Sequence, residues 1–308
     1  MGYEDNLIFK VAWFYYFENM TQQQISEKLG ITRMNVIKLL NKAKSQGIVQ
    51  FKIKTDGEKR MNLEKALMDK YQLSNVLVIP TSYTDINESI AIAAAQYIEA
   101  NISPNCYINV GYGDTISRVI KYLIHSLDNH VSLVSLSGGV SYYTSSIING
   151  AHKSDYNGQT PSIYLIPAPL IASDANLAEA FLGEESVKTI KAMNQLAYMT
   201  VVGVGAMMDT STIIRDNILS PNDLVLLKMN GAVGDILSQF FDKDGNVIDF
   251  DFHKRLITTH LDTLKTYKNV IGVAGGESKV EAIHASLLGG YLNVLITDEN
   301  TAEQLAAM

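Results

Sequence analysis

The sequence predicts an α/β protein in which an N-terminal all-α domain, with or without a wing, precedes a Rossmann-like domain built on a parallel sheet. The chain has 308 residues, more than one hydrophobic core usually serves. Residues 20–47 read as two short helices joined by a glycine turn. From residue 76 onward, short β-rich runs alternate with helical ones, a pattern typical of a parallel sheet covered by helices on both faces.

The distribution of charge places a domain boundary near residue 55. Residues 1–54 contain eight Lys or Arg against four Asp or Glu, which gives the head a net charge of +4. Because the whole chain has a net charge of −7, the remaining residues carry a net charge of −11. The turn-forming run Thr55-Asp56-Gly57 then predicts a break between two segments of secondary structure. We therefore expect a helix-turn-helix DNA-binding domain at 1–55 and a ligand-binding and oligomerisation domain at 56–308. DNA should be attracted to the basic head, and its binding should weaken with salt.

Composition narrows the class of protein further. Hydrophobic residues make up 47% and charged residues 19%, as in a packed globular protein. The single cysteine, Cys106, cannot form an internal disulfide, which favours a reducing compartment and a role as a buried small hydrophobe. The N-terminus lacks a signal-peptide pattern, and no apolar run approaches the ~20 residues of a membrane span. We expect a cytoplasmic protein without a membrane partner.

The head begins with an apolar-rich helix at 5–18, whose Trp13 we expect in the core rather than stacked on bases. The alternating run 48–54 predicts a short strand, a wing of the head. A helix at 58–71 follows. Its apolar side chains are expected to pack against the body or a second copy; they are Leu63, Ala66 and Leu67.

The first helix of the helix-turn-helix starts at a capping box. Thr21 and Gln24 have the spacing at which each side chain accepts a hydrogen bond from a backbone amide at the helix start. Ile25 and Leu29 give this helix one apolar edge, and Gly30 ends it.

The second helix, which Thr32 can cap, has two contrasting faces. The i, i+3, i+4, i+7 spacing puts an apolar set inward: Val36, Leu39, Leu40 and Ala43. The outer face is basic and amide-bearing, and no acidic residue lies on this helix. Amphipathic helices joined by a glycine turn are common and most bind nothing. The capped start, tight turn and missing acids together favour DNA binding here.

In a helix-turn-helix, the N-terminal part of the second helix reads bases in the major groove. The expected base readers are Arg33, Met34, Asn35, Ile37 and Lys38. Phosphate contacts position the protein without reading sequence. The remaining expected DNA contacts are Thr21, Gln22, Gln23, Thr32 and Lys42.

In the larger domain, helices are expected at 88–100 and 116–127. Expected strands cover 75–80, 106–110, 131–136, 162–167, 198–205, 224–229, 269–276 and 293–297. A helix ending at Phe240–Phe241, the turn Asp242–Gly245 and the extended run 246–252 suggest a small inserted hairpin.

Glycine pairs follow four of the expected strands, in the runs VGYGDT, LSGGV, VGVGA and AGGESK. At the carboxyl edge of a parallel sheet, such loops let backbone amides approach an anion. Asp114, Thr115, Ser137, Ser141 and Lys279 add polar groups, so the expected ligand is a phosphate on a small polyol or sugar. Any one loop could simply turn the chain. Neither a phosphate loop with Gly-Lys-Ser/Thr nor a complete dinucleotide fingerprint occurs, so we expect no nucleotide cofactor and no metal.

Taken together, these segments resemble the SorC family of bacterial sugar-binding transcriptional regulators. The resemblance spans essentially the whole chain: residues 15–53 of the head, then VGYGDT, LSGGV, VGVGAM, GAVGDIL with FFDKDG, and residues 274–305. It implies an effector domain similar to sugar-phosphate isomerases and aminosugar-phosphate deaminases. It also implies a homodimer or homotetramer whose binding to operator double-stranded DNA is altered by a phosphorylated sugar.

Carried over by position, the resemblance implies a set of effector-binding residues. They are Gly111, Gly113, Asp114, Thr115, Ser137, Gly138, Gly139, Gly205, Asp235 and Lys279. Asp235 would meet sugar hydroxyls and Lys279 the phosphate, although Asp235 could instead cap a helix and Lys279 could be an ordinary solvated lysine. Met34 and Ile37 stand where recognition helices of the family usually carry polar residues, which leaves the operator sequence open.

The expected function is therefore regulation of a carbohydrate-utilisation operon by a phosphorylated sugar, with no catalytic residues. One alternative is a sugar-phosphate isomerase or deaminase with a DNA-binding head, for which Asp235, Glu277 and His284 would supply acid–base chemistry. Another is a constitutive DNA-binding protein whose body only oligomerises.

Overall fold

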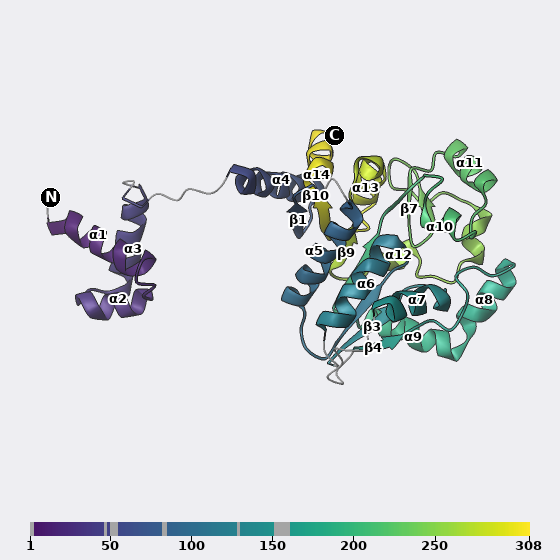
Figure 1. Cartoon of the computed structure of the whole chain (residues 1–308), viewed down its shortest axis with the longest axis horizontal. Helices are drawn as coiled ribbons and strands as arrows, with labels where there is room; N and C mark the ends of the chain where they lie inside the picture. The colour runs from purple at the N-terminus through teal and green to yellow at the C-terminus, as the bar shows by residue number, and fades with distance from the viewer. Residues whose placement is uncertain (1–2, 46–47, 50–54, 82–84, 128–129, 151–160) are drawn as a thin grey trace. The chain divides into compact units, whose positions relative to one another are not determined.

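A computed structural model describes residues 3–45, 48–49, 55–81, 85–127, 130–150 and 161–308 (Figure 1). The chain divides into two compact units, Met1–Glu58 and Lys59–Met308.

The first unit is a three-helix head made of α1 (Tyr3–Tyr16), α2 (Gln22–Leu29) and α3 (Arg33–Ser45). The capping box at Thr21 and Gln24 is present, and Gly30 ends α2 in the left-handed conformation. Thr32 Oγ1 accepts a hydrogen bond from the Asn35 amide at 3.2 Å, so it caps α3 as the sequence predicts. Inward-facing side chains from all three helices form the core: Ile8, Val11, Ala12, Ile25, Val36, Leu39, Leu40 and Ala43.

The position of Trp13 in the head differs from the expected one. Trp13 is not a core residue, because 43% of its surface is exposed. The helix is apolar on both sides, and its inner face is filled by the smaller Ile8, Val11 and Ala12, which leaves the tryptophan outside. The expected wing strand at 48–54 lies mostly outside the described residues; of it, only Ile48 and Val49 are described, as a bend.

The helix that opens the second part of the chain, α4 (Thr55–Tyr71), starts earlier than expected. Thr55-Asp56-Gly57 is its first turn rather than a break in the chain. Leu67 is buried in the core of the larger unit and Leu63 packs against that core, whereas Ala66 is exposed. Further along, Tyr71 Oη hydrogen-bonds His284 Nδ1 at 2.7 Å. The described part of α4 from residue 59 onward is thus fastened to the larger unit.

The larger unit is organised on a seven-stranded sheet in the order β1-β10-β9-β5-β2-β3-β4, with every pair parallel. The strands are β1 (Asn75–Ile79), β2 (Cys106–Val110), β3 (Val131–Ser135), β4 (Ser162–Tyr164), β5 (Met199–Gly203), β9 (Val270–Val273) and β10 (Val294–Asp298). Seven of the eight expected strands are therefore present. Cys106, at the start of β2, is only half-buried, and burial raises the pKa of its thiol.

Helices cover both faces of the sheet, as the alternating pattern predicts (Figure 1). One face packs against α5 (Ile86–Asn101), α6 (Asp114–Ser126) and α7 (Val140–Gly150). The other packs against α4, α8 (Ala175–Gly183), α9 (Glu185–Gln195), α13 (Val280–Leu288) and α14 (Glu299–Ala307). Adjacent residues of β5 show the alternation, because Val201 belongs to the first core and Val202 to the second.

The expected strand at 224–229 is wrong: these residues form α11 (Pro221–Met229). Ser220 and Asp223 make a capping box with Pro221 in the first turn, and this start signal outweighs the β-like run LVLLKM. Leu224 and Leu227 are buried, whereas Val225, Leu226 and Met229 are exposed.

The helix expected to end at Phe240–Phe241 is also wrong, because these residues lie in β8 (Gln239–Phe241). With β6 (Gly205–Ala206) and β7 (Gly234–Ile236), this strand makes a small antiparallel sheet. The expected turn at Asp242–Gly245 is present: Asp242 accepts the Gly245 amide, and Phe241 pairs with Val247. The remaining short helices are η1 (Asp251–Arg255), α10 (Thr212–Arg215), α12 (Leu261–Leu264) and η2 (Glu277–Lys279).

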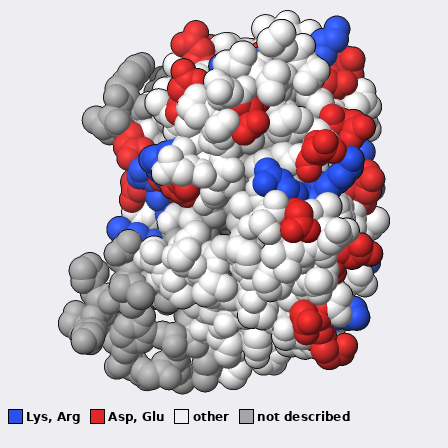
Figure 2. Space-filling view, turned by 90° about the vertical axis from the view of Figure 1, so that its right-hand side faces the viewer, with Lys and Arg blue, Asp and Glu red and all other residues white. Residues whose placement is uncertain are grey.

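Two further properties bear on partners. In the described part of the chain, no helix has the length and apolar character required to cross a bilayer. Figure 2 shows one face of the molecule, on which acidic side chains are spread widely and the basic ones of the described residues form only small groups. The described residues of that face therefore form no continuous positive surface of the kind that attracts DNA.

Candidate functional site

A cavity of about 310 Å³ lies at the carboxyl edge of the sheet, where the strand order changes direction. From β2 the chain proceeds outward to β3 and β4, and it then returns to β5 on the other side of β2. Such a switch point is where ligands bind in open parallel sheets. The walls are the loops after β2, β5 and β9, the small antiparallel sheet, and residues 210–215.

Six of the ten expected effector-binding residues line this one cavity. They are Gly113, Asp114, Thr115, Gly205, Asp235 and Lys279. These residues come from four separate regions of the sequence, brought together because parallel strands end at a common edge.

The other four expected residues are placed differently. Gly111 donates its amide to Val201 O at 2.8 Å and is buried below the cavity. Ser137 is fully buried against Tyr143, and a Cβ at Gly138 would lie 2.1 Å from Pro169 O, so this glycine serves a close approach of two backbone segments. Gly139 lines an adjoining hollow of about 930 Å³.

Asp235 projects from β7 into the cavity and does not cap a helix. Its Oδ2 accepts the Ser238 amide at 3.1 Å across a two-residue turn. Both turn residues, Leu237 and Ser238, have positive φ, a conformation that costs energy for residues other than glycine. Burial raises the pKa of Asp235 to about 6, opposed by the Ser238 hydrogen bond and the charge of Lys279.

Gly205 makes room for this carboxylate. It pairs with Asp235 between β6 and β7, and a Cβ at position 205 would lie 2.0 Å from Asp235 Oδ1. No side chain fits there while Asp235 keeps its place.

Lys279 ends the short helix η2 and reaches the same cavity. Burial lowers the pKa of its ammonium group, while the carboxylates of Asp235 and Asp114 act to raise it. The lysine is only partly exposed to solvent. A cation and a carboxylate face one space that is large enough for a small polar ligand.

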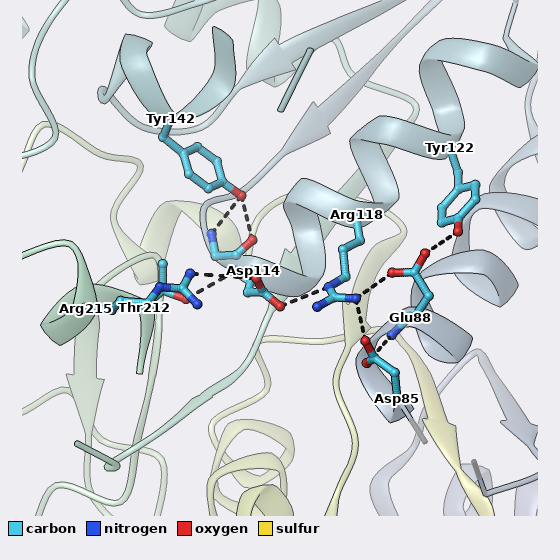
Figure 3. A network of polar contacts seen from close by, with 9 residues as sticks. Asp85, Glu88, Asp114, Arg118, Tyr122, Tyr142, Thr212 and Arg215 are labelled. Atoms are coloured by element: carbon cyan, nitrogen blue, oxygen red, sulfur yellow. Dashed lines mark hydrogen bonds and ion pairs between the residues drawn. The ribbon is translucent and has the colours of Figure 1, made fainter. Parts of the chain in front are cut away.

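Asp114 begins α6 and is the centre of a network of charges (Figure 3). Its Oδ2 accepts from Arg118 Nε at 3.0 Å, and Arg118 Nη1 also reaches Asp85 at 2.8 Å and Glu88 at 2.6 Å. Arg215 Nη2 lies 3.7 Å from Asp114 Oδ1. The hydrogen bond from Tyr122, followed by that from Arg118, holds the pKa of Glu88 below its usual range. The Glu88 amide lowers the pKa of Asp85 most, and Arg118 lowers it further.

The amides at the start of α6 are already hydrogen-bonded to side-chain hydroxyls (Figure 3). The Gly113 amide donates to Tyr142 Oη at 3.1 Å, and the same hydroxyl donates to Gly113 O at 2.6 Å. The Asp114 amide donates to Thr212 Oγ1 at 3.3 Å. An anion that binds these amides must displace the two hydroxyls.

Sequence reasoning missed several residues of the cavity wall. Tyr112 stands between the two glycines of VGYGDT, and its ring lies 4.1 Å from that of Tyr142. Position alone would have identified it. Thr212 and Arg215 come from residues 210–215, where no motif signals a binding site. The helical i+4 spacing to Asp114 would have identified Arg118 as its partner.

The acid–base set considered for an enzyme is not assembled. Glu277 is exposed and does not line the cavity. His284 is engaged by Tyr71, outside the cavity lining. Of these three residues, only Asp235 lines the cavity.

In the head, nearly all of the expected DNA contacts are exposed along α2 and α3; Gln22 and Ile37 are half-buried. Met34 is 62% exposed at the start of α3. Arg33 Nε lies 3.4 Å from Gln22 Oε1, so an expected base reader and an expected phosphate contact are neighbours. Both line a broad hollow with Thr21 and Gln23, and the described lining residues include no acid.

Comparison with known proteins adds two findings on sequence. A family model of a sugar-binding domain, Sugar-bind, matches residues 56–307. The transcriptional regulator LsrR of Escherichia coli K12 is 37% identical over 306 residues, covering 97% of this chain and 94% of LsrR. LsrR of Klebsiella pneumoniae is 34% identical and covers 99% of this chain and 94% of its own length.

Solved structures share the fold. The full-length sorbitol operon regulator SorC from Klebsiella pneumoniae superposes with a TM-score of 0.69 at 24% identity, covering 98% of this chain and 99% of SorC. A DeoR family transcriptional regulator from Listeria monocytogenes has a TM-score of 0.68 at 21% identity and covers 80% of this chain and 99% of its own.

Proposed function

This chain belongs to the SorC family of sugar-binding transcriptional regulators, and we propose that a phosphorylated sugar in the cavity beside β2 and β5 controls its affinity for operator DNA. The chain is a transcriptional regulator with a sugar-binding domain rather than an enzyme, as its relatives are. The proposed target is a carbohydrate-utilisation operon. One observation carries the proposal: the side chains of Asp235 and Lys279, both partly buried, face the same cavity.

The proposed ligand follows from the chemistry of this lining. A carboxylate accepts hydrogen bonds from sugar hydroxyls, and an ammonium group pairs with a phosphate. Arg215 and the amides of Gly113 and Asp114 add donors for the phosphate. At about 310 Å³ the cavity is of the size that small ligands occupy.

The hydroxyl groups of Tyr142 and Thr212, which accept hydrogen bonds from the amides at the start of α6, suggest how ligand binding changes the structure elsewhere. A phosphate that takes these amides displaces Tyr142, which lies on α7, and Thr212, which lies on α10. Both elements would then shift. A ligand changes an equilibrium only by its differential affinity for two states, and a tenfold change in DNA affinity requires about 1.4 kcal/mol of coupling.

On the DNA side, α3 is proposed to enter the major groove, with Arg33, Met34, Asn35, Ile37 and Lys38 at the bases. Two heads are needed to bind half-sites one helical turn apart, so we propose a homodimer or homotetramer acting in the cytoplasm. Either state supplies paired heads.

Fluorescence anisotropy of the full chain on DNA from upstream of its neighbouring genes tests the proposal. The titration is run with and without a panel of phosphorylated sugars. A shift of the binding curve by one phosphorylated sugar, and not by its unphosphorylated form, is expected. If DNA binds but no sugar phosphate moves the curve or raises the melting temperature, the body only oligomerises.

A further inference from the structure

Ser211 carries a buried hydroxyl for which the described residues supply no hydrogen-bond partner. Buried polar side-chain atoms are nearly always hydrogen-bonded, because an unpaired one has lost its contact with water without compensation. Three other described residues contain such an atom, namely Asn194, Thr258 and Thr297, and none of the three lines the cavity beside β2 and β5. Ser211 does line it. An unpaired donor therefore lies in the wall of the proposed binding site.

The side chain of Ser211 does not cap the helix that it precedes. Ser211 and Ser220 stand directly before α10 and α11 with similar backbone angles: φ −60° and ψ 149° for Ser211, φ −78° and ψ 155° for Ser220. Ser220 Oγ accepts a hydrogen bond from the Asp223 amide at 3.1 Å, as is usual for a serine in this position. Ser211 makes no such bond, although its backbone angles permit one. Its hydroxyl is therefore available to another group.

Backbone hydrogen bonds hold Ser211 in place. Its amide donates to Met208 O at 3.0 Å, and its carbonyl oxygen accepts the amides of Ile214 at 3.1 Å and Arg215 at 3.0 Å. Because the backbone groups of Ser211 are paired, the hydroxyl is the polar group of this residue that still lacks a partner in the described part of the chain. A donor that is fixed before the ligand arrives loses little conformational freedom on binding.

The neighbours of Ser211 point to a phosphate oxygen as the missing partner. Thr212, the next residue, accepts the Asp114 amide through Oγ1 at 3.3 Å (Figure 3). A phosphate that displaces the Thr212 hydroxyl from this amide would lie beside Ser211, since both side chains line the same cavity. Arg215 and Lys279 line it as well and supply positive charge. Hydrogen bonds to an anionic oxygen are stronger than those between neutral groups.

We propose that the Ser211 hydroxyl donates a hydrogen bond to the phosphate group of the effector. The inference rests on the proposed function and adds a phosphate contact to it. A free sugar would leave this buried hydroxyl without a partner, whereas a phosphorylated sugar would satisfy it. Ser211 therefore contributes to the selection of phosphorylated over unphosphorylated sugars.

Ser211→Ala in the full chain separates this role from a structural one. Because the lost hydroxyl has no partner in the free protein, the melting temperature without ligand should equal that of the wild type or exceed it. Isothermal titration with inorganic phosphate, ribose 5-phosphate and glucose 6-phosphate measures binding. Every probe that binds the wild type should bind the variant about 10- to 150-fold more weakly, the effect of one hydrogen bond to a charged group. The factor should not depend on the sugar.

Thr258→Val is the matched control. It also removes a buried hydroxyl that has no partner among the described residues, but Thr258 does not line the cavity. Its melting temperature should respond as that of Ser211→Ala does, while binding of every probe stays unchanged. Ser211→Cys replaces the hydroxyl by a weak donor at the same position and should bind the probes nearly as weakly as Ser211→Ala.

The remaining outcomes contradict the inference in distinguishable ways. Unchanged affinity in Ser211→Ala would mean that water satisfies the hydroxyl. A loss for the sugar phosphates but not for inorganic phosphate would place the hydroxyl against the sugar. A loss accompanied by a lower melting temperature without ligand would make Ser211 a structural residue. These three results leave the proposed function intact, whereas a wild type that binds none of the probes overturns both.

Discussion

At the residue scale, the cavity depends on the absence of one side chain. Gly205 and Asp235 are paired across β6 and β7, and the carboxylate occupies the space that a Cβ would need. The carboxylate is partly buried and lines the same cavity as Lys279, so its position determines what the cavity can hold.

Gly205→Ala should abolish the effector response. The new methyl group would lie about 2.0 Å from Asp235 Oδ1, so the carboxylate must move. Gly183→Ala, at the end of α8 with no atom within 4 Å of the added methyl, is the matched control. Isothermal titration with the active sugar phosphate measures both. Equal binding by the two variants would show that Asp235 does not contact the ligand.

Lys279→Ala should weaken effector binding by about 10- to 150-fold, the equivalent of one charge-assisted contact of ~1.5–3 kcal/mol. The ligand-induced rise in melting temperature should disappear while operator binding without ligand is unchanged. Lys188→Ala, exposed on α9, should behave as wild type. Retention of the rise in Lys279→Ala would remove this lysine from the phosphate site.

Asp235 also predicts a pH dependence of stability. Burial raises its pKa from 3.8 to about 6, so the folded state holds a proton that the unfolded state has lost between these pH values. The stabilising protonated form is fully present below pH 4 and is lost as the pH rises through 6. Relative to wild type, the unfolding free energy of Asp235→Asn should rise by about 2–3 kcal/mol from pH 4 to 7. Denaturant unfolding at several pH values measures this difference, and a pH-independent difference would contradict it.

At the element scale, the same local signals have different consequences in the two units. Capping boxes begin both α2 and α11, one by Thr21 and Gln24, the other by Ser220 and Asp223. In the head, the resulting α2 supports α3, whose outer side remains open. In the larger unit, α11 turns a run of β-prone residues into a helix with apolar side chains on both sides.

Arg33→Ala, at the start of α3, should weaken operator binding by about 5- to 150-fold, the ~1–3 kcal/mol of one base contact. Gln23→Ala, at an expected phosphate contact on α2, should weaken binding to all sequences uniformly. Neither change should alter the effector-induced rise in melting temperature. Anisotropy with operator and scrambled duplexes distinguishes them, and an equal loss on both duplexes would make Arg33 a phosphate contact.

At the scale of the whole molecule, opposite charges in the two parts separate their functions. The first 54 residues have a net charge of +4 and the remainder a net charge of −11, so DNA is attracted to the head and repelled by the body. The effector, in contrast, is bound by a few buried groups within the acidic part.

Operator affinity should therefore fall steeply with salt, whereas effector affinity should change little. If paired heads neutralise six to ten phosphates, raising salt from 50 to 200 mM should lower DNA affinity by about 10³- to 10⁵-fold. Buried pairs such as a phosphate on Lys279 are screened much less. Parallel titrations over this range measure both, and a shallow salt dependence for DNA would argue against a phosphate-tracking head.

Local sequence signals determined much of this architecture. The capping box at Thr21, the left-handed Gly30 and the inward set on α3 all follow from spacing, because a helix start, a helix end and an amphipathic face are properties of neighbouring residues. Seven of the eight expected strands and the helices expected at 88–100 and 116–127 were likewise predicted correctly. The glycine loops also indicated the correct edge of the sheet for a cavity.

Only the tertiary structure decided which residues meet. Ser137 and Gly138 belong to the right kind of loop, yet Ser137 pairs with Thr258, Gly138 packs against residues 168–169, and neither lines the cavity. Thr212 and Arg215 reach Asp114 from about 100 positions away, and Trp13 is outside because smaller side chains fill the core below it. Such outcomes depend on the volumes of distant elements and on which strand ends lie adjacent. Those are long-range packing properties that no local pattern encodes.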